Sequence, residues 1–333
     1  MPMSRWAFYA LARTLTGLLL VVGSVTTWAA EPELAQKWLE RMAESVNGLS
    51  YRGTFVYQHE GRLETMRLIR RTYGDDQRER LYALSGPARE IIRDNEKVTC
   101  YLPSDGAVRV DWQQSSNPFA DVLPDDIALL TVHYRFELQG RERIAEREAQ
   151  VVAVLPRDSF RYGYRLWMDV EHGLLLRSDL LNEQGDVLEQ LVFTELEVVD
   201  NVPEQWLRPE IEADMIISFE RPDPRELQAE PHEEPTWTVA DLPPGFGLRS
   251  YRLRNLPGSS NPVEHLLYSD GLASVSVYIE SERAERAFAG GSRVGVVNAF
   301  GHWEDGLQFI VVGEVPANTV TQIGRSLEPV ASE

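Results

Sequence analysis

The six histidines and the single cysteine are the residues best suited to bind a metal or attack a substrate. The histidines are His59, His133, His172, His232, His265 and His302. No two of them have the spacing of zinc ligands, and none is adjacent to Cys100. Cys100 lies in the stretch Val-Thr-Cys-Tyr-Leu, which is typical of a buried strand and contains no group that would activate a thiol. These residues predict no metal, no cofactor and no thiol chemistry.

The sequence also lacks the motifs of other common catalytic sites. The chain lacks the Gly-x-Ser-x-Gly turn of serine hydrolases. Residues 290–295 resemble a phosphate-binding loop, but they lack its lysine and precede a predicted strand. Asp and Glu number 52, yet no two are singled out as a glycosidase pair, and Asp125 or Asp126 is better explained as a helix cap. The sequence therefore offers no recognisable catalytic machinery, and we expect that the chain is not an enzyme.

The N-terminus has the pattern of a secretory signal peptide. Arg5 and Arg13 precede or flank a short apolar stretch at 15–25, and small residues follow around Ala29. Eleven apolar residues are too few to cross a bilayer core of about 30 Å. We expect cleavage after Ala29 and export of the mature chain.

The charge and the cysteine count exclude further classes. The formal net charge is −19, and the predicted signal carries two Arg and no acid, so its removal would leave −21. A chain this acidic repels nucleic acids at long range. An exported protein with one cysteine cannot form an internal disulfide, so its stability must come from hydrophobic cores.

The first predicted domain, 30–220, opens on an amphipathic helix with apolar residues from Leu34 to Val46 at three- and four-residue spacing. Period-two alternation then predicts a series of antiparallel strands. A short helix carrying Ile127, Leu130 and Tyr134 is expected within the insert at 115–134. Several later strands are apolar on both faces, so the sheet needs a cover on each side or encloses something.

A proline-rich, acidic stretch at 221–235 predicts a linker to a second domain. That domain, 236–328, contains five strand-like runs and a hairpin turn at Ser269-Asp270-Gly271. Pro316 is expected in the first turn of a C-terminal helix whose apolar face carries Val320, Ile323 and Leu327.

Long stretches of both domains resemble the MucB/RseB family of periplasmic sigma-factor regulators. In the first domain they are residues 51–57, 84–93, 161–167, 173–179 and 189–194. In the second they are residues 242–246 and 263–273. The resemblance covers nearly all of the predicted mature chain, in order, and is far more specific than a short motif.

The resemblance implies an α+β, mainly antiparallel fold. Its larger domain would be a curved half-barrel sheet like that of periplasmic lipoprotein carriers, with covering helices, beside a smaller sheet with a C-terminal helix. It also implies that the chain binds the periplasmic region of a transmembrane anti-sigma factor and shields it from regulated proteolysis. A lipid or lipopolysaccharide signal would relieve the shielding.

Two other functions stay open at this stage. A lipid or lipoprotein carrier is suggested by the first domain alone, although the second domain argues against a simple shuttle. An envelope hydrolase is suggested only by the abundant carboxylates. A homodimer is compatible with the sequence.

Candidate binding residues follow from these expectations. An apolar lipid pocket would be lined by residues of the insert and of an aromatic strand, namely Phe119, Leu123, Ile127, Leu130, Tyr162, Tyr164 and Trp167. Each also fits an ordinary core position. The partner would bind at the domain junction and at the second domain's Glu264, His265, Tyr268 and Asp270, which also fit a hairpin and its turn.

Overall fold

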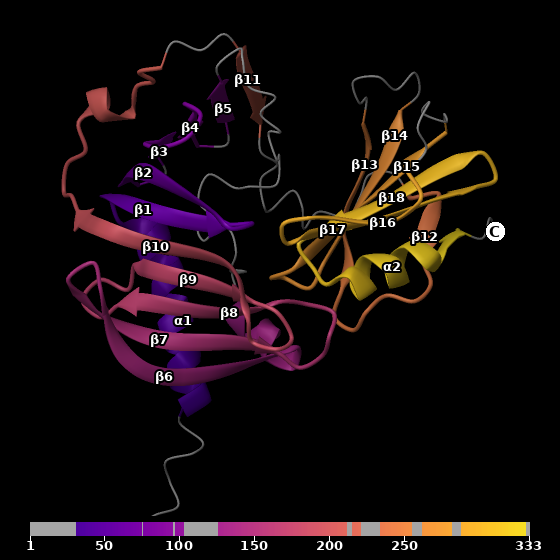
Figure 1. Ribbon diagram of the computed structural model, residues 1–333, viewed down its shortest axis with the longest axis horizontal. Helices are drawn as coiled ribbons and strands as arrows, with labels where there is room; N and C mark the ends of the chain where they lie inside the picture. Colours follow the sequence, from indigo (N-terminus) through magenta and orange to yellow (C-terminus); the bar gives the residue numbers. More distant parts are fainter. Residues whose placement is uncertain are drawn as a thin grey trace, which may run out of the picture.

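The computed structural model describes two units, each built on an antiparallel sheet (Figure 1). The described residues are 31–74, 76–95, 97–102, 126–211, 215–220, 234–254, 262–281 and 288–330. The predicted signal peptide, most of the predicted linker, and the pocket candidates Phe119 and Leu123 lie outside them. The expected α+β, mainly antiparallel fold is confirmed.

The first unit is an open sheet of eleven strands that curves around one helix (Figure 1). Its strand order is β11-β5-β4-β3-β2-β1-β10-β9-β8-β7-β6, so the first strand lies at the centre. The elements are α1 (Glu31–Gly48), β1 (Tyr51–His59), β2 (Arg62–Tyr73), β3 (Asp76–Ala83), β4 (Glu90–Asp94), β5 (Lys97–Leu102), η1 (Ile127–Val132), β6 (Tyr134–Ile144), β7 (Arg147–Pro156), β8 (Gly163–Asp169), β9 (Leu175–Leu181), β10 (Val187–Val198), η2 (Glu204–Leu207) and β11 (Met215–Glu220).

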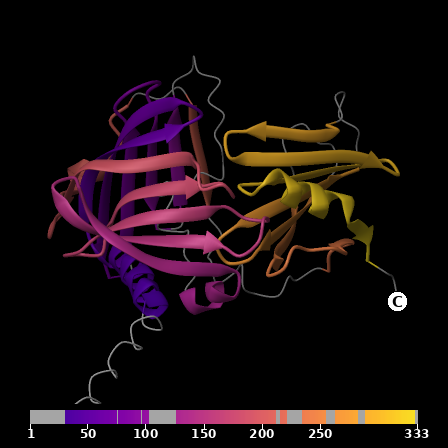
Figure 2. The ribbon, with the colours of Figure 1, turned by 60° about the horizontal axis from the view of Figure 1, so that its bottom comes forward.

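The second unit is a six-stranded sheet beside the first, with one helix against it (Figure 2). Its order is β13-β14-β15-β18-β17-β16, and a short β12-β19 pair lies next to it. The elements are β12 (Trp237–Val239), β13 (Gly247–Arg254), β14 (Val263–Ser269), β15 (Ser274–Glu280), β16 (Gly290–Val294), β17 (Val297–Glu304), β18 (Leu307–Gly313), α2 (Ala317–Arg325) and β19 (Leu327–Pro329).

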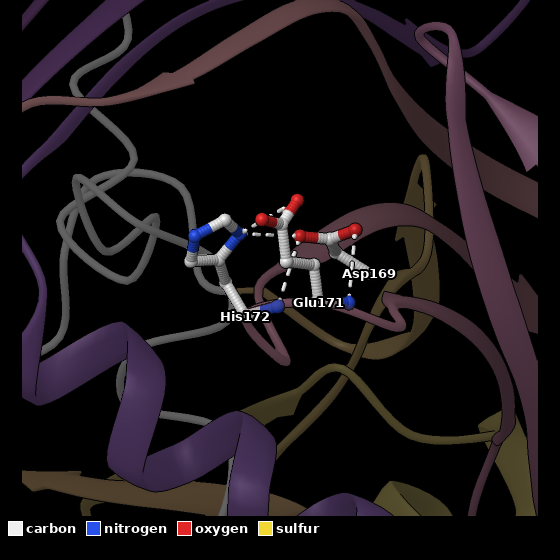
Figure 3. A group of neighbouring side chains, drawn as sticks. All are labelled: Asp169, Glu171 and His172. Atoms are coloured by element: carbon white, nitrogen blue, oxygen red, sulfur yellow. Dashed lines mark hydrogen bonds and ion pairs between the residues drawn. The ribbon is translucent and has the colours of Figure 1, made fainter.

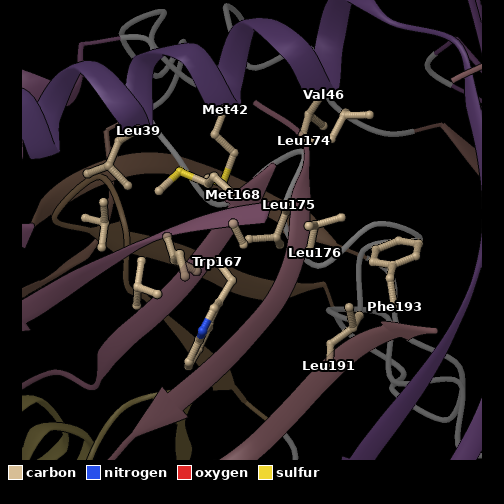
Figure 4. Close-up of a cluster of buried hydrophobic side chains, with 14 of the residues drawn as sticks. Leu39, Met42, Val46, Trp167, Met168, Leu174, Leu175, Leu176, Leu191 and Phe193 are labelled. Atoms are coloured by element: carbon tan, nitrogen blue, oxygen red, sulfur yellow. The ribbon is translucent and has the colours of Figure 1, made fainter. Parts of the chain in front are cut away.

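Helix α1 fills the concave side of the large sheet. Its buried face carries Leu39, Met42 and Val46, which pack over Met168 and Leu176 in the same cluster (Figure 4). The three- and four-residue spacing places these helix side chains on one stripe, and the sheet's alternation supplies the opposing apolar face. The helix is therefore part of the core of this unit.

The helix in the insert is shorter than expected. The Asp126 side chain caps it by accepting from the Ala128 N–H at 3.0 Å, as one of the two alternatives predicted. The helix is a 3₁₀ helix that ends when the His133 N–H donates to the Leu130 carbonyl. The expectation that Tyr134 continues the helix was wrong, because Tyr134 begins β6 and pairs with Pro156.

Apolar residues on both faces of the large sheet are covered on both sides. On the convex face Trp167 is only 2% exposed, and the Arg177 guanidinium lies 4.1 Å from its ring centroid. Elsewhere on that face the chain after β10 crosses the sheet and buries Val202 and Leu207 against Ile69. A sheet with apolar residues on both faces needs packing on each side to shield them from water, and these contacts provide it on the convex face.

The C-terminal helix forms where the sequence predicts. Pro316 precedes its first turn, and Val320 and Ile323 are buried in the second core. Leu327 differs from expectation, because it leaves the helix and begins β19, which pairs with Val239 of β12. Among the described residues, no helix has the length and apolarity needed to cross a membrane.

The role of α1 gives a stability prediction. Leu39→Ala removes a fully buried side chain and should lower the free energy of unfolding of the first unit by about 3 kcal/mol. Leu34→Ala, on the same helix but 45% exposed, is the matched control and should cost under about 1 kcal/mol. Urea titration followed by circular dichroism measures both, and equal losses would show that α1 is not packed as described.

Candidate functional site at the junction of the two units

A buried ion pair joins the two units. The Arg161 side chain, which lies just before β8, has no exposed surface and donates from Nη1 to the Asp270 carboxylate at 2.6 Å. Asp270 lies in the turn between β14 and β15 and is equally buried. Arg161 also donates from Nε to Asp158 at 3.1 Å. The two partners of the ion pair are 109 residues apart in the chain, so the contact fixes the tertiary arrangement.

The Asp270 carboxylate is saturated with donors. Its Oδ2 accepts from the Tyr134 hydroxyl at 2.9 Å as well as from Arg161. Its Oδ1 accepts from the backbone N–H groups of Leu272 and Ala273 at 2.8 and 2.7 Å. Burial, followed by the negative charge of Asp270, raises the pKa of Tyr134, so that hydroxyl stays protonated and donates. One carboxylate thus shapes its own turn and holds the other unit.

The loop that leads into β13 forms the third side of the clamp. Arg161 donates from Nη2 to the Pro244 carbonyl at 2.5 Å, and its guanidinium lies 5.1 Å from the Phe246 ring centroid. Between them Gly245 has φ +87, and an added Cβ would lie 2.2 Å from His133 Nε2. Only glycine fits this turn against the end of η1.

Two further contacts extend the junction. Tyr162 packs with Leu180 and Val296, and its hydroxyl accepts from Asn298 Nδ2 at 3.1 Å. At the start of α2, the Thr319 hydroxyl donates to the Phe160 carbonyl at 2.8 Å. The loop before β8 therefore contacts both the sheet and the helix of the second unit.

Carboxylates lie at the edge of this junction. Glu60 accepts from the Gly295 N–H at 2.6 Å, which links the β1–β2 turn to the turn between β16 and β17. Nearby, the Tyr57 hydroxyl donates to Glu189 at 2.5 Å. Burial and then the Glu189 charge raise the pKa of Tyr57 far above its ordinary value. Glu60 and Glu189 therefore accept hydrogen bonds from donors within the same chain.

The five described lipid-pocket candidates all lie in packed regions of the chain. Ile127 and Leu130 are buried in the core beside α1. Tyr164 and Trp167 are three residues apart on β8 and therefore lie on opposite faces of the sheet. Tyr162 packs at the junction instead. Ile127, Leu130 and Trp167 belong to one buried cluster, and Tyr164 packs against both that cluster and the one that contains Tyr162.

The predicted partner residues also have contacts within the chain. Glu264 accepts from Thr236 and Tyr251, at 2.6 and 3.1 Å. His265 is buried, lies in hydrogen-bond contact with Ser276 and stacks on Tyr278 with ring centroids 4.5 Å apart. Tyr268 is 2% exposed in the second core, and Asp270 is the junction carboxylate. His265, Tyr268 and Asp270 are buried, and Glu264 is half-buried.

The sequence analysis did not identify Arg161 as a functional residue. Alternation along 161–170 assigns it to one face of a strand, whereas it precedes the strand and enters the second unit. A buried arginine needs a carboxylate, and no local signal indicates which of 52 acids provides it. The stretches 161–167 and 263–273 that resemble the family contain Arg161 and Asp270, but the resemblance does not indicate that the two residues pair.

One cluster of Asp169, Glu171 and His172 brings three possible ligand atoms within 4.8 Å of one another (Figure 3). Arg147 already contacts this cluster, with its Nη2 2.9 Å from Asp169 Oδ2 and 2.8 Å from His172 Nδ1. Burial would raise the pKa of Asp169, but the bonds from Arg147 and His172 outweigh it and hold that pKa below its ordinary value. A guanidinium thus occupies the place where a cation would bind.

This cluster fastens the β8–β9 turn to α1. Arg41 donates to the Glu171 carbonyl at 2.6 Å, and the Ser45 hydroxyl donates to the His172 carbonyl. Asp169 accepts from the His172 N–H at 3.1 Å and shapes the turn itself. Asp169, Glu171 and His172 therefore have a structural role, which is to shape the β8–β9 turn and hold it against α1.

Comparisons with known proteins agree with the two-unit architecture. The model of the MucB/RseB N-terminal domain matches residues 34–211, and that of the MucB/RseB C-terminal domain matches residues 231–328. The sigma factor AlgU regulatory protein MucB of Pseudomonas aeruginosa is 34% identical over 335 residues, covering 95% of this chain and 98% of the relative. The sigma-E factor regulatory protein RseB of Escherichia coli K12 is 27% identical over 318 residues, covering 94% and 95%.

Solved structures give the same result. A crystal structure of MucB in complex with MucA(peri) has a TM-score of 0.70 and 32% identity, covering 90% of this chain and all of that one. A second structure, of the Pseudomonas aeruginosa MucA/MucB complex, has a TM-score of 0.70 and 34% identity, covering 90% and 99%.

The junction yields a stability prediction. Asp270→Asn leaves the buried Arg161 guanidinium without its charged partner and should lower the free energy of unfolding by about 3–5 kcal/mol. Glu137→Gln breaks the exposed ion pair with Arg135 and should cost under about 1 kcal/mol. Thermal and urea unfolding of both variants checks the contrast, which fails if the two losses are alike.

His265 gives a pH prediction. Burial, then the nearby charges of Arg254 and Arg252, lower its pKa to about 4. In the unfolded chain the imidazole takes up a proton near pH 6.5, whereas in the folded chain it does not until about pH 4. Stability should therefore fall as the pH falls through this window, by at most about 3 kcal/mol from this residue.

The variant His265→Gln should flatten that dependence between pH 6.5 and 4.5. Part of the dependence of stability on pH should remain in this variant, because burial also lowers the pKa of His302. Asp169 contributes only at lower pH, because its folded-state pKa lies below its ordinary value. Urea unfolding at a series of pH values measures the slope, and an unchanged slope in the variant would contradict the assignment.

Proposed function

The chain belongs to the MucB/RseB family, and on this premise we propose that it negatively regulates an envelope-stress sigma factor from the periplasm. It would bind the periplasmic region of a transmembrane anti-sigma factor and shield that region from regulated proteolysis. The observation that carries the proposal is the similarity of both units together to MucB in its complex with MucA(peri).

The geometry of the junction supports a binding role. Its charged groups, Arg161, Asp158 and Asp270, satisfy one another and backbone groups. None of them is left free to activate a substrate, which a catalytic acid or base requires. The junction instead holds two sheets in one orientation, which presents a preorganised surface to a partner.

Shielding requires only occupancy. A protease cleaves the fraction of its substrate that is unbound, and at a regulator concentration 100 times the Kd that fraction is about 1%. The proposal therefore needs no chemical step by this chain. It needs a binding site and a signal that weakens binding.

We further propose that an acylated lipid provides that signal. The concave face under α1 is apolar, and η1 packs there through Ile127 and Leu130. The chain runs from η1 directly into Tyr134, whose hydroxyl holds Asp270 of the second unit. An acyl chain that displaced η1 would thus act on the junction, and it would release the partner only if it bound the free form more tightly.

A lipid or lipoprotein carrier is the second candidate, favoured by the same apolar concave face. A carrier should hold an acyl ligand in stoichiometric amount and pass it to an acceptor. Native mass spectrometry of the purified mature protein, before and after mixing with an acceptor, separates the two functions.

A protease-protection assay tests the main proposal. The mature chain should slow cleavage of the anti-sigma periplasmic region in proportion to occupancy, and an acylated glycolipid should restore cleavage. The deacylated glycolipid is the control and should have no effect. Cleavage at the same rate with and without the chain, together with no measurable binding, would refute the proposal.

A further inference from the structure

A pocket of about 250 Å³ lies on the convex face of the large sheet, away from the concave face and the junction. It is bounded by β1, β2, β3 and β10 and by the segment of η2 that carries Trp206. Three arginines line it, Arg52, Arg67 and Arg80, with the aromatic side chains of Tyr82 and Trp206. In a chain of net charge −19, three guanidinium groups around one small pocket are unexpected.

Two of these arginines are held in place by acids. Arg80 is buried, forms an ion pair with Glu90, and donates to the Trp206 carbonyl at 3.1 Å. Arg52 forms an ion pair with Glu197 at 2.6 Å, and its guanidinium lies 4.7 Å from the Trp206 ring centroid. These contacts build the pocket wall and leave little of either charge for a ligand.

The third arginine differs. Arg67 is half-buried, and among the described residues its one recorded hydrogen bond is from Nε to the Thr54 hydroxyl at 3.2 Å. No described carboxylate forms an ion pair with it, so its two terminal nitrogens are available to a ligand. Arginine donors in this fork geometry recognise carboxylates and phosphates.

Two acids line the same pocket, Glu195 and Glu210, and Glu210 forms an ion pair with Arg80 at 3.3 Å. Glu195 of β10 is exposed, and Thr54 of β1 pairs with both Glu195 and Arg67. The two charges therefore lie two strand spacings apart, about 10 Å between backbones. Glu195 offsets part of the positive charge and should weaken anion binding.

We propose that this pocket binds a small oxyanion, a phosphate monoester or carboxylate on a planar or apolar body, with Arg67 as the charged contact. The volume fits a molecule of roughly ten heavy atoms and is below that of pockets for larger ligands. Trp206 and Tyr82 would contact the body, while Arg67 donates to the anionic group. This site is independent of the proposed anti-sigma binding.

Titration of the full mature chain with phenyl phosphate, benzoate and inorganic phosphate tests the site. Nuclear magnetic resonance would follow the indole N–H of Trp206, assigned with Trp206→Phe. Phenyl phosphate should bind more tightly than inorganic phosphate because of its ring, and added salt should weaken it. Comparison with benzoate identifies the preferred oxyanion, and vesicles containing phosphatidic acid show whether a lipid headgroup can supply it.

Variants of the two charged residues should change the Kd in opposite directions. Arg67→Gln should raise the Kd about tenfold or more, whereas Glu195→Gln should lower it about two- to threefold. Arg62→Gln, on the same strand but exposed and outside the pocket, is the matched control and should leave the Kd unchanged. Should Arg67→Gln fold poorly, Arg67→Lys keeps the charge but not the fork and should still weaken binding.

Absence of binding by any of the probes would overturn the proposal. So would binding that Arg67→Gln and Glu195→Gln leave unchanged. Protection of the anti-sigma region is a separate measurement, so failure of one proposal is distinguishable from failure of the other.

Discussion

The arrangement of the two units depends on one buried ion pair, Arg161 with Asp270. Removing two charges from water costs several kcal/mol for each, and their attraction offsets this only when every remaining donor and acceptor is satisfied. Here the Arg161 guanidinium reaches two carboxylates and one carbonyl, and Asp270 accepts from four donors. The main effect of the ion pair is to fix the relative orientation of the two units. Hydrogen bonds of fixed geometry allow one orientation, where an apolar contact would allow several.

That orientation extends into both cores. On one side Asp270 shapes the turn between β14 and β15, whose strands carry the second core. On the other side Tyr134 begins β6, against which α1 packs. The clamp is thus continuous with the hydrophobic core of each unit, and a force on either core can reach it through packed side chains. Such continuity gives a physical route for coupling, although it does not by itself set the size of the coupling.

Local patterns predicted the elements and missed the long-range contacts. The periodicity of α1, the alternation of β1 and the capping by Asp126 are short-range properties, and the structure contains each of them. The separation of Tyr164 from Trp167 also follows from period two, so grouping them in one pocket conflicted with the alternation of that strand. In contrast, the Arg161–Asp270 pair and the pairing of β11 with β5 join segments about a hundred residues apart, and no local rule specifies such partners.

The same reasoning limits how a signal could act on this fold. The three charged groups of the clamp, Arg161, Asp158 and Asp270, are paired with one another, so a ligand cannot release them by direct electrostatic competition at little cost. A change must come from displacement of packed groups, and η1 is the short element that contacts both the concave core and, through His133 and Tyr134, the second unit. A 3₁₀ helix of six residues has few hydrogen bonds to lose, so it is easier to displace than α1 or a central strand. Movement there would alter the surroundings of Gly245 and Asp270 together, and both residues are contact points of the second unit with the first.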